Sequence, residues 1–180
     1  SYCPEGTRYS NEYLCPNGTY NPYTLIGNEL DCTPCSPGMY CALPGLIEPT
    51  GKCREGYYCG GGSAVPMPHE SSHSDGTESS YTGDSCVLPL EMPNDICPPG
   101  HYCPEGSNVP QPCPAGTNST SMGLTNVSQC LPCTAGYYCP TNGTINATTL
   151  CPQGYFCPAG TNTYTLECPT GSYCETGSAF

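Results

Sequence analysis

Two Cys-x-x-Cys motifs have a spacing that could support chemistry. Cys32-Thr-Pro-Cys35 and Cys130-Leu-Pro-Cys133 are spaced like the ligands of zinc knuckles and the thiols of oxidoreductases. A zinc site needs a second ligand pair at matching spacing, and a redox motif needs a strand–helix frame that lowers the pKa of a thiol. Neither context surrounds these motifs, so we interpret the four cysteines as half-cystines of structural disulfides.

Histidine is the other candidate ligand or general base, and the chain has three: His69, His73 and His101. His69 and His73 lie four residues apart, which would make a metal pair on a helix, but the Ser/Gly-rich segment around them favours a loop. The acidic residues are scattered singly, without the spacing of a calcium loop. No nucleophile elbow or phosphate loop occurs. We therefore expect no enzyme, no cofactor and no metal site.

Charge narrows the possible partners. The chain of 180 residues has a formal net charge of −12, with only three basic residues, Arg8, Lys52 and Arg54. Such a charge repels phosphate backbones and anionic lipid surfaces, so we expect no nucleic acid partner. The apolar runs are too short to span a bilayer, so we expect no membrane insertion. A secreted inhibitor remains an alternative class, but Lys52 and Arg54 flank Cys53 inside a repeat and do not resemble a displayed bait loop.

Five Asn-x-Ser/Thr motifs are candidate N-glycosylation acceptors. Any one motif is a weak signal, whereas five in a chain with 18 cysteines indicate the secretory pathway and an extracellular surface. We therefore predict a secreted glycoprotein with N-glycans on Asn17, Asn118, Asn126, Asn142 and Asn146.

The elements that carry these residues are short, repeated cysteine units. In each unit a cysteine is followed six residues later by another, with glycine at the fourth place and an aromatic residue before the second cysteine. With 22 Gly, 22 Pro, no Trp and two Phe, the chain cannot form a conventional apolar core, so crosslinks must replace burial. We predict a small disulfide-rich fold of elongated tandem repeats, with turns, short β-hairpins and little or no helix. The six units begin at Cys35, Cys53, Cys97, Cys133, Cys151 and Cys168.

A larger repeat includes these units. The cysteines from Cys15 to Cys59 recur 98 residues later, with the same spacing, from Cys113 to Cys157. We divide the chain into a first repeat at 1–59, truncated at its N-terminus, a flexible Gly/Ser-rich insertion with Cys86 at 60–96, a second repeat at 97–157 and the start of a third at 158–180.

Each unit should open with a tight turn. In Cys97-Pro98-Pro99-Gly100 we expect proline at the second place of the turn and glycine at the fourth. We expect the aromatic residue before the second cysteine to pack over a disulfide or a proline ring, and a tyrosine ligand surface is the alternative.

Spacing alone does not determine the disulfide pairing. The most economical scheme joins neighbouring units first to third and second to fourth. A rival scheme closes Cys15 to Cys32 and Cys113 to Cys130, and leaves Cys97 and Cys103 without partners. It shares the bonds Cys35–Cys53, Cys41–Cys59, Cys133–Cys151 and Cys139–Cys157 with the economical scheme. Cys86 has no counterpart in the second repeat and is the likeliest free thiol. The economical scheme predicts Cys35–Cys53, Cys41–Cys59, Cys133–Cys151, Cys139–Cys157, Cys97–Cys113, Cys103–Cys130 and Cys3–Cys32.

The run Cys113-Pro-Ala-Gly-Thr117, followed by Cys130-Leu-Pro-Cys133-Thr-Ala-Gly-Tyr-Tyr-Cys139-Pro140, resembles the ephrin-receptor-like cysteine-rich repeat. That repeat is more distantly similar to tumour-necrosis-factor-receptor modules. The resemblance covers nearly the whole chain except about 60–96 and implies an elongated extracellular module. Such modules occur in receptors, in matrix proteins and, as long arrays, in protist surface and mastigoneme-type filament proteins. The extra six-spaced cysteines and very low Lys/Arg content depart from the receptor forms.

We therefore expect a structural segment of a secreted, N-glycosylated filament or surface coat, with a ligand-binding receptor ectodomain stalk as the alternative. The expected partners are copies of the chain itself or adjacent repeats in a fibre. Tyr2-Cys3-Pro4 opens the sequence inside a unit, and Cys168 and Cys174 lack answering cysteines in the economical scheme. That arrangement predicts head-to-tail assembly into open filaments.

Overall fold

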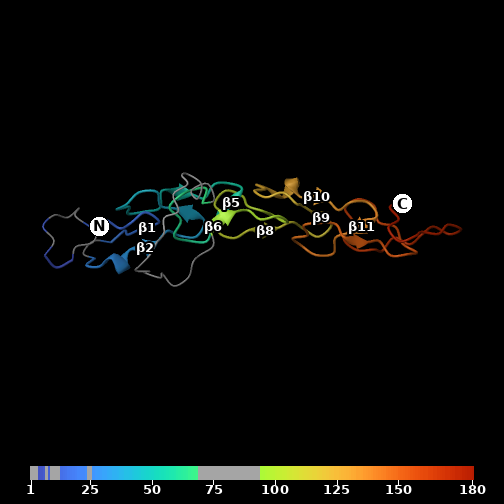
Figure 1. Ribbon diagram of the computed structural model, residues 1–180, viewed down its shortest axis with the longest axis horizontal. Coiled ribbons are helices and arrows are strands. Elements are labelled where there is room, and N and C mark those ends of the chain that lie inside the picture. Colours follow the sequence, from blue (N-terminus) through green and yellow to red (C-terminus); the bar gives the residue numbers. More distant parts are fainter. Residues whose placement is uncertain (1–3, 7, 9–12, 24–25, 69–93) are drawn as a thin grey trace, which may run out of the picture. The chain divides into compact units, whose positions relative to one another are not determined.

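The computed structural model, which describes residues 4–6, 8, 13–23, 26–68 and 94–180, consists of short two-stranded antiparallel hairpins (Figure 1). Helical structure in these residues is limited to the single 3-10 turns η1 (Glu29–Asp31) and η3 (Val127–Gln129). The predicted fold class is confirmed. The hairpins pair β1 (Thr19–Tyr20) with β2 (Thr33–Pro34), β3 (Met39–Tyr40) with β4 (Gly51–Lys52), β5 (Tyr57–Cys59) with β6 (Asn94–Ile96), β7 (His101–Tyr102) with β8 (Gln111–Pro112), β9 (Thr117–Asn118) with β10 (Leu131–Pro132), and β11 (Tyr137–Tyr138) with β12 (Thr149–Leu150).

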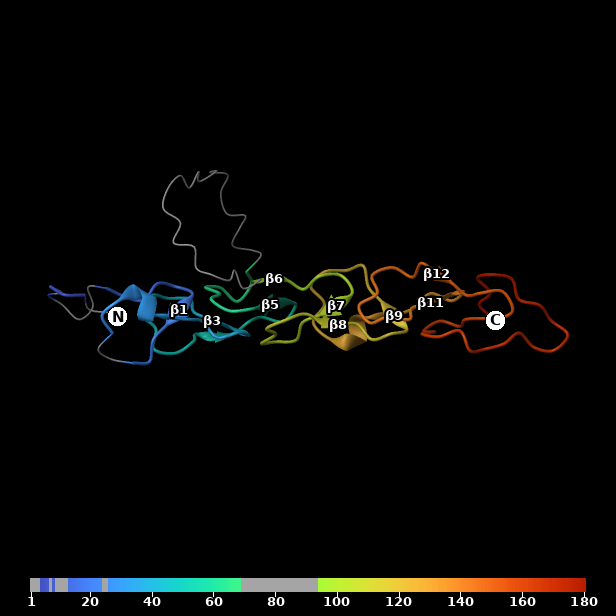
Figure 2. The ribbon, with the colours of Figure 1, turned by 90° about the horizontal axis from the view of Figure 1, so that it is seen from below.

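The chain forms two compact units. Unit one comprises Ser1–Ile96 and Glu105–Val109 and contains β1 to β6, and unit two comprises Cys97–Pro104 and Pro110–Phe180 and contains β7 to β12. The 98-residue repeat is visible in the elements themselves, since β1, η1, β2, β3 and β4 recur in unit two as β9, η3, β10, β11 and β12. Figure 2 shows β11 beside β12 within unit two.

The tight turn of each unit begins one residue later than the sequence analysis predicted. The amide of Met39 donates to the carbonyl of Ser36 at 3.0 Å, so the turn is Ser36-Pro37-Gly38-Met39. Glycine therefore occupies the third place, where its φ of +79° is the positive value that a type II turn requires. Likewise, the amide of His101 donates to Pro98 at 3.2 Å. The expected turn at Cys97–Gly100 is thus wrong by one residue.

Each six-spaced pair of cysteines is bonded to itself. The Cα atoms of such a pair lie 5.8–6.0 Å apart, within the range that a disulfide spans. Two further disulfides close longer segments that lie between the six-spaced pairs. Among the described residues, the eight bonds are Cys15–Cys32, Cys35–Cys41, Cys53–Cys59, Cys97–Cys103, Cys113–Cys130, Cys133–Cys139, Cys151–Cys157 and Cys168–Cys174.

The economical pairing scheme is therefore wrong at every bond. A turn centred on Pro37 and Gly38 reverses the chain, so Cys35 and Cys41 face each other across a closed loop. The economical scheme instead joined cysteines that belong to different six-spaced pairs. The rival scheme was right about Cys15–Cys32 and Cys113–Cys130. The pairings corrected are Cys35–Cys53, Cys41–Cys59, Cys133–Cys151, Cys139–Cys157, Cys97–Cys113, Cys103–Cys130 and Cys3–Cys32.

The disulfides themselves form the core. Among the described residues, the large side chains that are less than 2 % exposed all belong to disulfide-bonded cysteines. Leu124 is the one buried aliphatic residue in this part of the chain. Leu124 packs with Cys113 and Cys130, and Tyr102 lies against this cluster. Crosslinks thus replace apolar burial, as the composition predicts.

Part of the expected flexible insertion belongs to the fold of unit one. The amide of Cys41 donates to the carbonyl of Ser63 at 2.8 Å, and Ser63 is buried. At the other end of the insertion, β6 pairs with β5 through the register Tyr57↔Ile96. Residues 60–68 and 94–96 of the predicted insertion therefore contact the rest of unit one. Cys86 and the remainder of the insertion, at 69–93, lie outside the described residues.

Candidate functional site

The repeated feature of this chain is a backbone rung made of two glycines and one cysteine. In unit one, the Gly38 amide donates to the carbonyl of Cys59 at 2.7 Å, and the Cys53 amide donates to the Gly38 carbonyl at 2.8 Å. The Gly106 amide then donates to the Cys53 carbonyl at 2.8 Å. Each rung thus ties a turn to the next two segments of its unit, and no side chain takes part.

The same rung recurs throughout both units. Gly18, Cys35 and Gly62 form it in unit one, with bonds of 2.8 Å. In unit two, Gly136 donates to Cys157 and accepts from Cys151, whose carbonyl accepts from Gly177. Because the bonds involve only backbone atoms, the rung can be repeated while the loops between the cysteines vary in sequence. Two more rungs consist of Gly116, Cys133 and Gly160, and of Gly100, Cys113 and Gly143, where the Gly100 amide donates to Ser119 instead of to a cysteine.

Glycine is required at the turn of each rung for two reasons. Its φ is positive, and a Cβ at Gly38 would lie 2.4 Å from the carbonyl oxygen of Gly106. A Cβ at Gly136 would lie equally close to the carbonyl oxygen of Gly177. Any other residue at these places would push the neighbouring strand away and break the rung.

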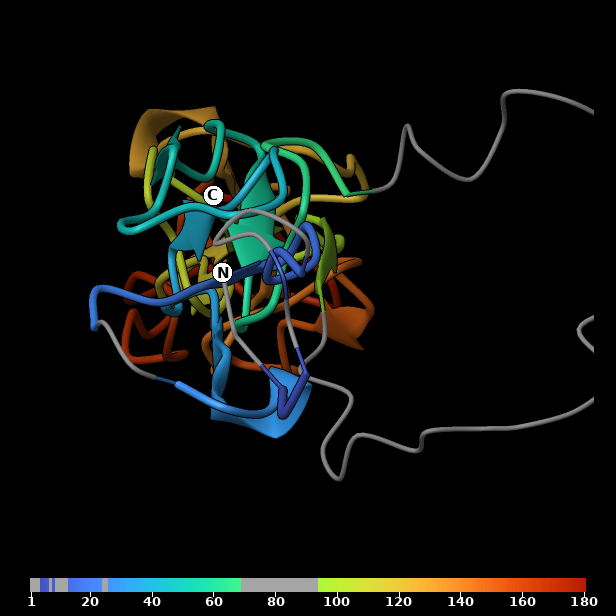
Figure 3. The ribbon, with the colours of Figure 1, turned by 90° about the vertical axis from the view of Figure 1, so that its left-hand side faces the viewer.

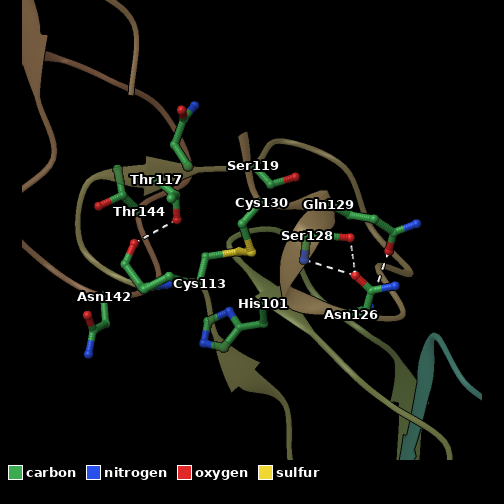
Figure 4. The surroundings of a disulfide bond; sticks show 12 residues. His101, Cys113, Thr117, Ser119, Asn126, Ser128, Gln129, Cys130, Asn142 and Thr144 are labelled. Carbon is green, nitrogen blue, oxygen red and sulfur yellow. Dashed lines mark hydrogen bonds between the residues drawn. A yellow bond between two sulfur atoms is a disulfide. The ribbon is translucent and has the colours of Figure 1, made fainter. Parts of the chain in front are cut away.

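Asn126 combines a candidate glycan acceptor with a structural role. It is the N-cap of η3, where its carboxamide oxygen accepts from the Ser128 amide at 2.9 Å and also from the Ser128 hydroxyl (Figure 4). Asn28 has the same role at η1, accepting from the Leu30 amide at 3.1 Å. The capping interaction uses the oxygen, whereas an N-glycan is attached through the nitrogen, so the cap and a glycan are compatible.

The other predicted acceptors differ in how they are placed. Asn17 is exposed at the second place of the turn from Pro16, and Asn146 is exposed in the loop before β12. Asn142 accepts from the Ala115 amide at 2.9 Å through its oxygen. Asn118 departs from the expected loop position, because it lies on β9 and its carboxamide nitrogen donates to Ile145 at 3.2 Å. A glycan on Asn118 would have to replace or share that nitrogen.

The Cys-x-x-Cys motifs form neither of the sites considered for them, a zinc site or a redox-active thiol pair. Cys32, Cys35, Cys130 and Cys133 are all disulfide-bonded to other partners. In the part of the chain that the structure describes, no group of three or more His, Cys, Asp or Glu side chains is arranged to hold a metal ion. His101 lies with its Nδ1 atom 3.1 Å from the Pro99 carbonyl. His69 and His73 lie outside the described residues.

Two of the three basic side chains are engaged at the surface of unit one. The Lys52 ammonium lies 3.6 Å from a Glu105 carboxylate oxygen, and both side chains are mostly exposed, so the pair contributes little to stability. Arg54 donates to the Met67 sulfur at 2.9 Å. Lys52 lies on β4, and Arg54 opens the turn between β4 and β5.

The tyrosines serve mainly as packing residues within each unit. The Tyr138 and Tyr155 rings both contact Tyr164 edge to face, with centroids 5.2 and 5.4 Å apart. Burial and, secondarily, the Asp95 carboxylate raise the pKa of Tyr58. Tyr173 departs from the pattern, because it is 82 % exposed and covers no disulfide. The packing expectation holds for Tyr102 and fails for Tyr173.

Neither a protein-family model nor a curated protein sequence matches this chain. Among its described residues, none of the helical segments has the length and apolar character that crossing a bilayer requires. The candidate functional features of the chain are therefore the repeated rungs, the disulfides and the candidate glycan acceptors.

Proposed function

We propose that this chain is a structural segment of a secreted, N-glycosylated extracellular filament or surface coat. The observation that carries the proposal is the repeated rung, in which loops closed by their own disulfides are joined through backbone hydrogen bonds alone. Such a unit can be added repeatedly without a new side-chain interface, which is the construction principle of repeat proteins.

Eight disulfides support an extracellular location, because disulfides at this density persist in oxidising compartments. The five candidate acceptors support the same location. The net charge of −12 keeps neighbouring copies soluble until specific contacts form.

Assembly through unpaired cysteines no longer supports the proposal. Cys168 and Cys174 are bonded to each other and leave no open thiol for a head-to-tail disulfide. Copies of the chain or adjacent repeats remain the proposed partners, joined by covalent continuation or by non-covalent docking.

A receptor ectodomain stalk is the second candidate function. It is favoured by large apolar side chains that unit one leaves exposed, including Tyr23, Leu30 and Ile47. In a purely structural segment these positions would more commonly be polar.

Immunogold electron microscopy of native material with an antibody to this chain tests the proposal. A structural segment should be labelled in regular rows along fibres or across a continuous coat. Labelling dispersed singly over the cell surface, together with monomeric sedimentation of the released protein, would contradict the filament and favour the receptor stalk.

A further inference from the structure

Unit one carries an exposed apolar patch. We define the patch as Tyr23, Leu30 and Ile47, whose side chains are 75, 82 and 68 % exposed. One buried residue holds the backbone of all three segments together. The Asn21 amide donates to the Leu46 carbonyl at 2.9 Å, and the Asn21 side chain donates to the Asp31 carbonyl at 2.7 Å.

The carboxamide oxygen of Asn21 completes the arrangement by accepting from the Tyr23 amide at 2.7 Å. Each member of the patch is therefore bonded to Asn21 directly or lies next to a residue that is. η1, which contains Leu30, lies at the periphery of unit one (Figure 3). The patch is thus a fixed surface of unit one, because its three segments share one buried anchor.

The 98-residue repeat supplies an internal comparison. Tyr23 and Leu30 correspond to Ser121 and Ser128 of unit two, while Ile47 corresponds to Ile145. Unit two thus has serines at two of the three positions, although Met122, Val127 and Ile145 are exposed at or beside them in the sequence.

The two units also differ in the number of candidate glycan acceptors near these positions. In unit two the loops around these positions contain Asn126, Asn142 and Asn146 as acceptors, whereas unit one has no acceptor motif between Asn17 and the end of β4. Asn17 itself belongs to the turn that precedes β1, on the far side of that strand from Asn21. Candidate acceptors are therefore fewer in the sequence around the patch than around the equivalent residues of unit two.

Charge distinguishes the two surfaces as well. Glu29, Asp31 and Glu48 flank the patch, and all three are exposed. Their counterparts in unit two are Val127, Gln129 and Asn146, which are neutral. No lysine or arginine occurs between Arg8 and Lys52, so the charged residues next to the patch in the sequence are all acidic.

We propose that the patch of unit one is a docking surface for a different protein, one that presents apolar side chains flanked by lysine or arginine. Complementarity between these acidic residues and a basic partner identifies this occupant. A second copy of the chain fits poorly, because it would bring 15 acidic and only three basic residues. The contrast with unit two depends on the proposed N-glycosylation, and the exposed patch itself does not.

The test uses the full chain secreted from a glycosylating eukaryotic host and two synthetic peptides. One peptide has leucines flanked by lysines, and the other is identical except that glutamate replaces each lysine. Fluorescence anisotropy should show binding of the basic peptide that is at least about tenfold tighter than that of the acidic peptide. Leu30→Ala should weaken binding of the basic peptide about tenfold or more, whereas Leu131→Ala, at a residue 63 % exposed in unit two, should leave it unchanged.

Leu30→Ser is the sharper variant, because it turns Asn28-Glu29-Leu30 into an acceptor motif like Asn126-Val-Ser128. We expect this variant to gain a glycan on Asn28 by mass and to lose binding of the basic peptide. Equal binding of both peptides, or binding unaffected by either Leu30 variant, would overturn the proposal. Concentration-dependent dimerisation of the wild type that Leu30→Ala abolishes would also overturn it, in favour of a second copy. None of these outcomes depends on whether the native material forms fibres.

Discussion

At the scale of single residues, the glycines of the rungs and the capping asparagines determine which positions can vary. A turn glycine such as Gly136 has a φ of +83° and also lies against a neighbouring carbonyl. Gly154 has a φ of +88°, but a Cβ there would meet nothing within 4 Å. A substitution at Gly154 therefore adds conformational strain alone, whereas a substitution at Gly136 adds a steric clash as well.

We predict that Gly136→Ala destabilises unit two far more than Gly154→Ala does. The strain of a positive φ should cost about 1 kcal/mol at both positions. At Gly136 the Cβ would lie 2.4 Å from the Gly177 carbonyl oxygen, so the rung must open and the total loss should reach about 3 kcal/mol or more. Urea unfolding with the disulfides intact measures both variants. Equal losses would show that the rung contributes nothing.

The asparagine caps provide a second prediction at this scale. Asn28→Ala should cost about 1 kcal/mol through loss of the η1 cap, with no change in glycan mass. Asn126→Ala should cost about the same and also remove one glycan. Ser128→Ala should remove the glycan while the Ser128 amide keeps its bond to Asn126. Intact mass and unfolding free energy check these variants. An unchanged mass in both unit-two variants would contradict glycosylation at Asn126.

At the scale of elements, the hairpins and their own disulfides are the independent pieces of the fold. A six-spaced disulfide such as Cys151–Cys157 closes a loop that the type II turn has already folded. Its removal should therefore have a local effect, unlike the removal of one bond from an interlaced set.

We predict that the double variant Cys151→Ser, Cys157→Ser loses about 2 kcal/mol of stability and keeps the other seven disulfides unchanged. Removal of Cys113–Cys130, with a sequence separation of 17, should cost about 3 kcal/mol, because the loop that it closes is longer. Non-reducing peptide maps of the two double variants check the pairing. New pairs in the first map would show that the loops are interlaced after all.

The sequence predicts these elements well and their connections poorly. Composition and the Cys-x-x-Gly spacing predict turns, hairpins and a cystine core, since few other folds tolerate so little apolar residue content. The pairing was wrong because both schemes joined cysteines of different six-spaced pairs, whereas Cys97 bonds Cys103 across the turn at Pro98–His101. A positive φ at glycine is shared by several turn types, so the pattern alone does not set the register.

Two features of the candidate site were also missed, for reasons of context. The segment Gly60–Ser63 reads as a linker by composition, yet Ser63 is buried because its carbonyl accepts from Cys41. Asn21 carries no motif, and its role as an anchor depends on Leu46 and Asp31, which are distant in sequence. The acceptor asparagines, by contrast, are recognisable because the motif is local.

At the scale of the whole molecule, the protein consists of loops that are each closed by their own disulfide. The pattern of these cysteines repeats at a spacing of 98 residues. This arrangement allows the sequence to vary in the loops, and unit one and unit two use that freedom differently. Unit two contains most of the candidate glycan acceptors, and unit one presents the apolar patch with acidic residues next to it in the sequence.

Non-reducing peptide mapping of the native secreted protein tests whether each six-spaced pair of cysteines closes its own loop. Cleavage between the units should release separate peptides in which Cys35 is joined to Cys41, Cys53 to Cys59 and Cys133 to Cys139. The Cys15–Cys32 and Cys113–Cys130 bonds should be the two that connect longer segments. Peptides that join Cys35 to Cys53 or Cys133 to Cys151, or free thiols at these positions, would contradict the ladder and the extracellular role built on it.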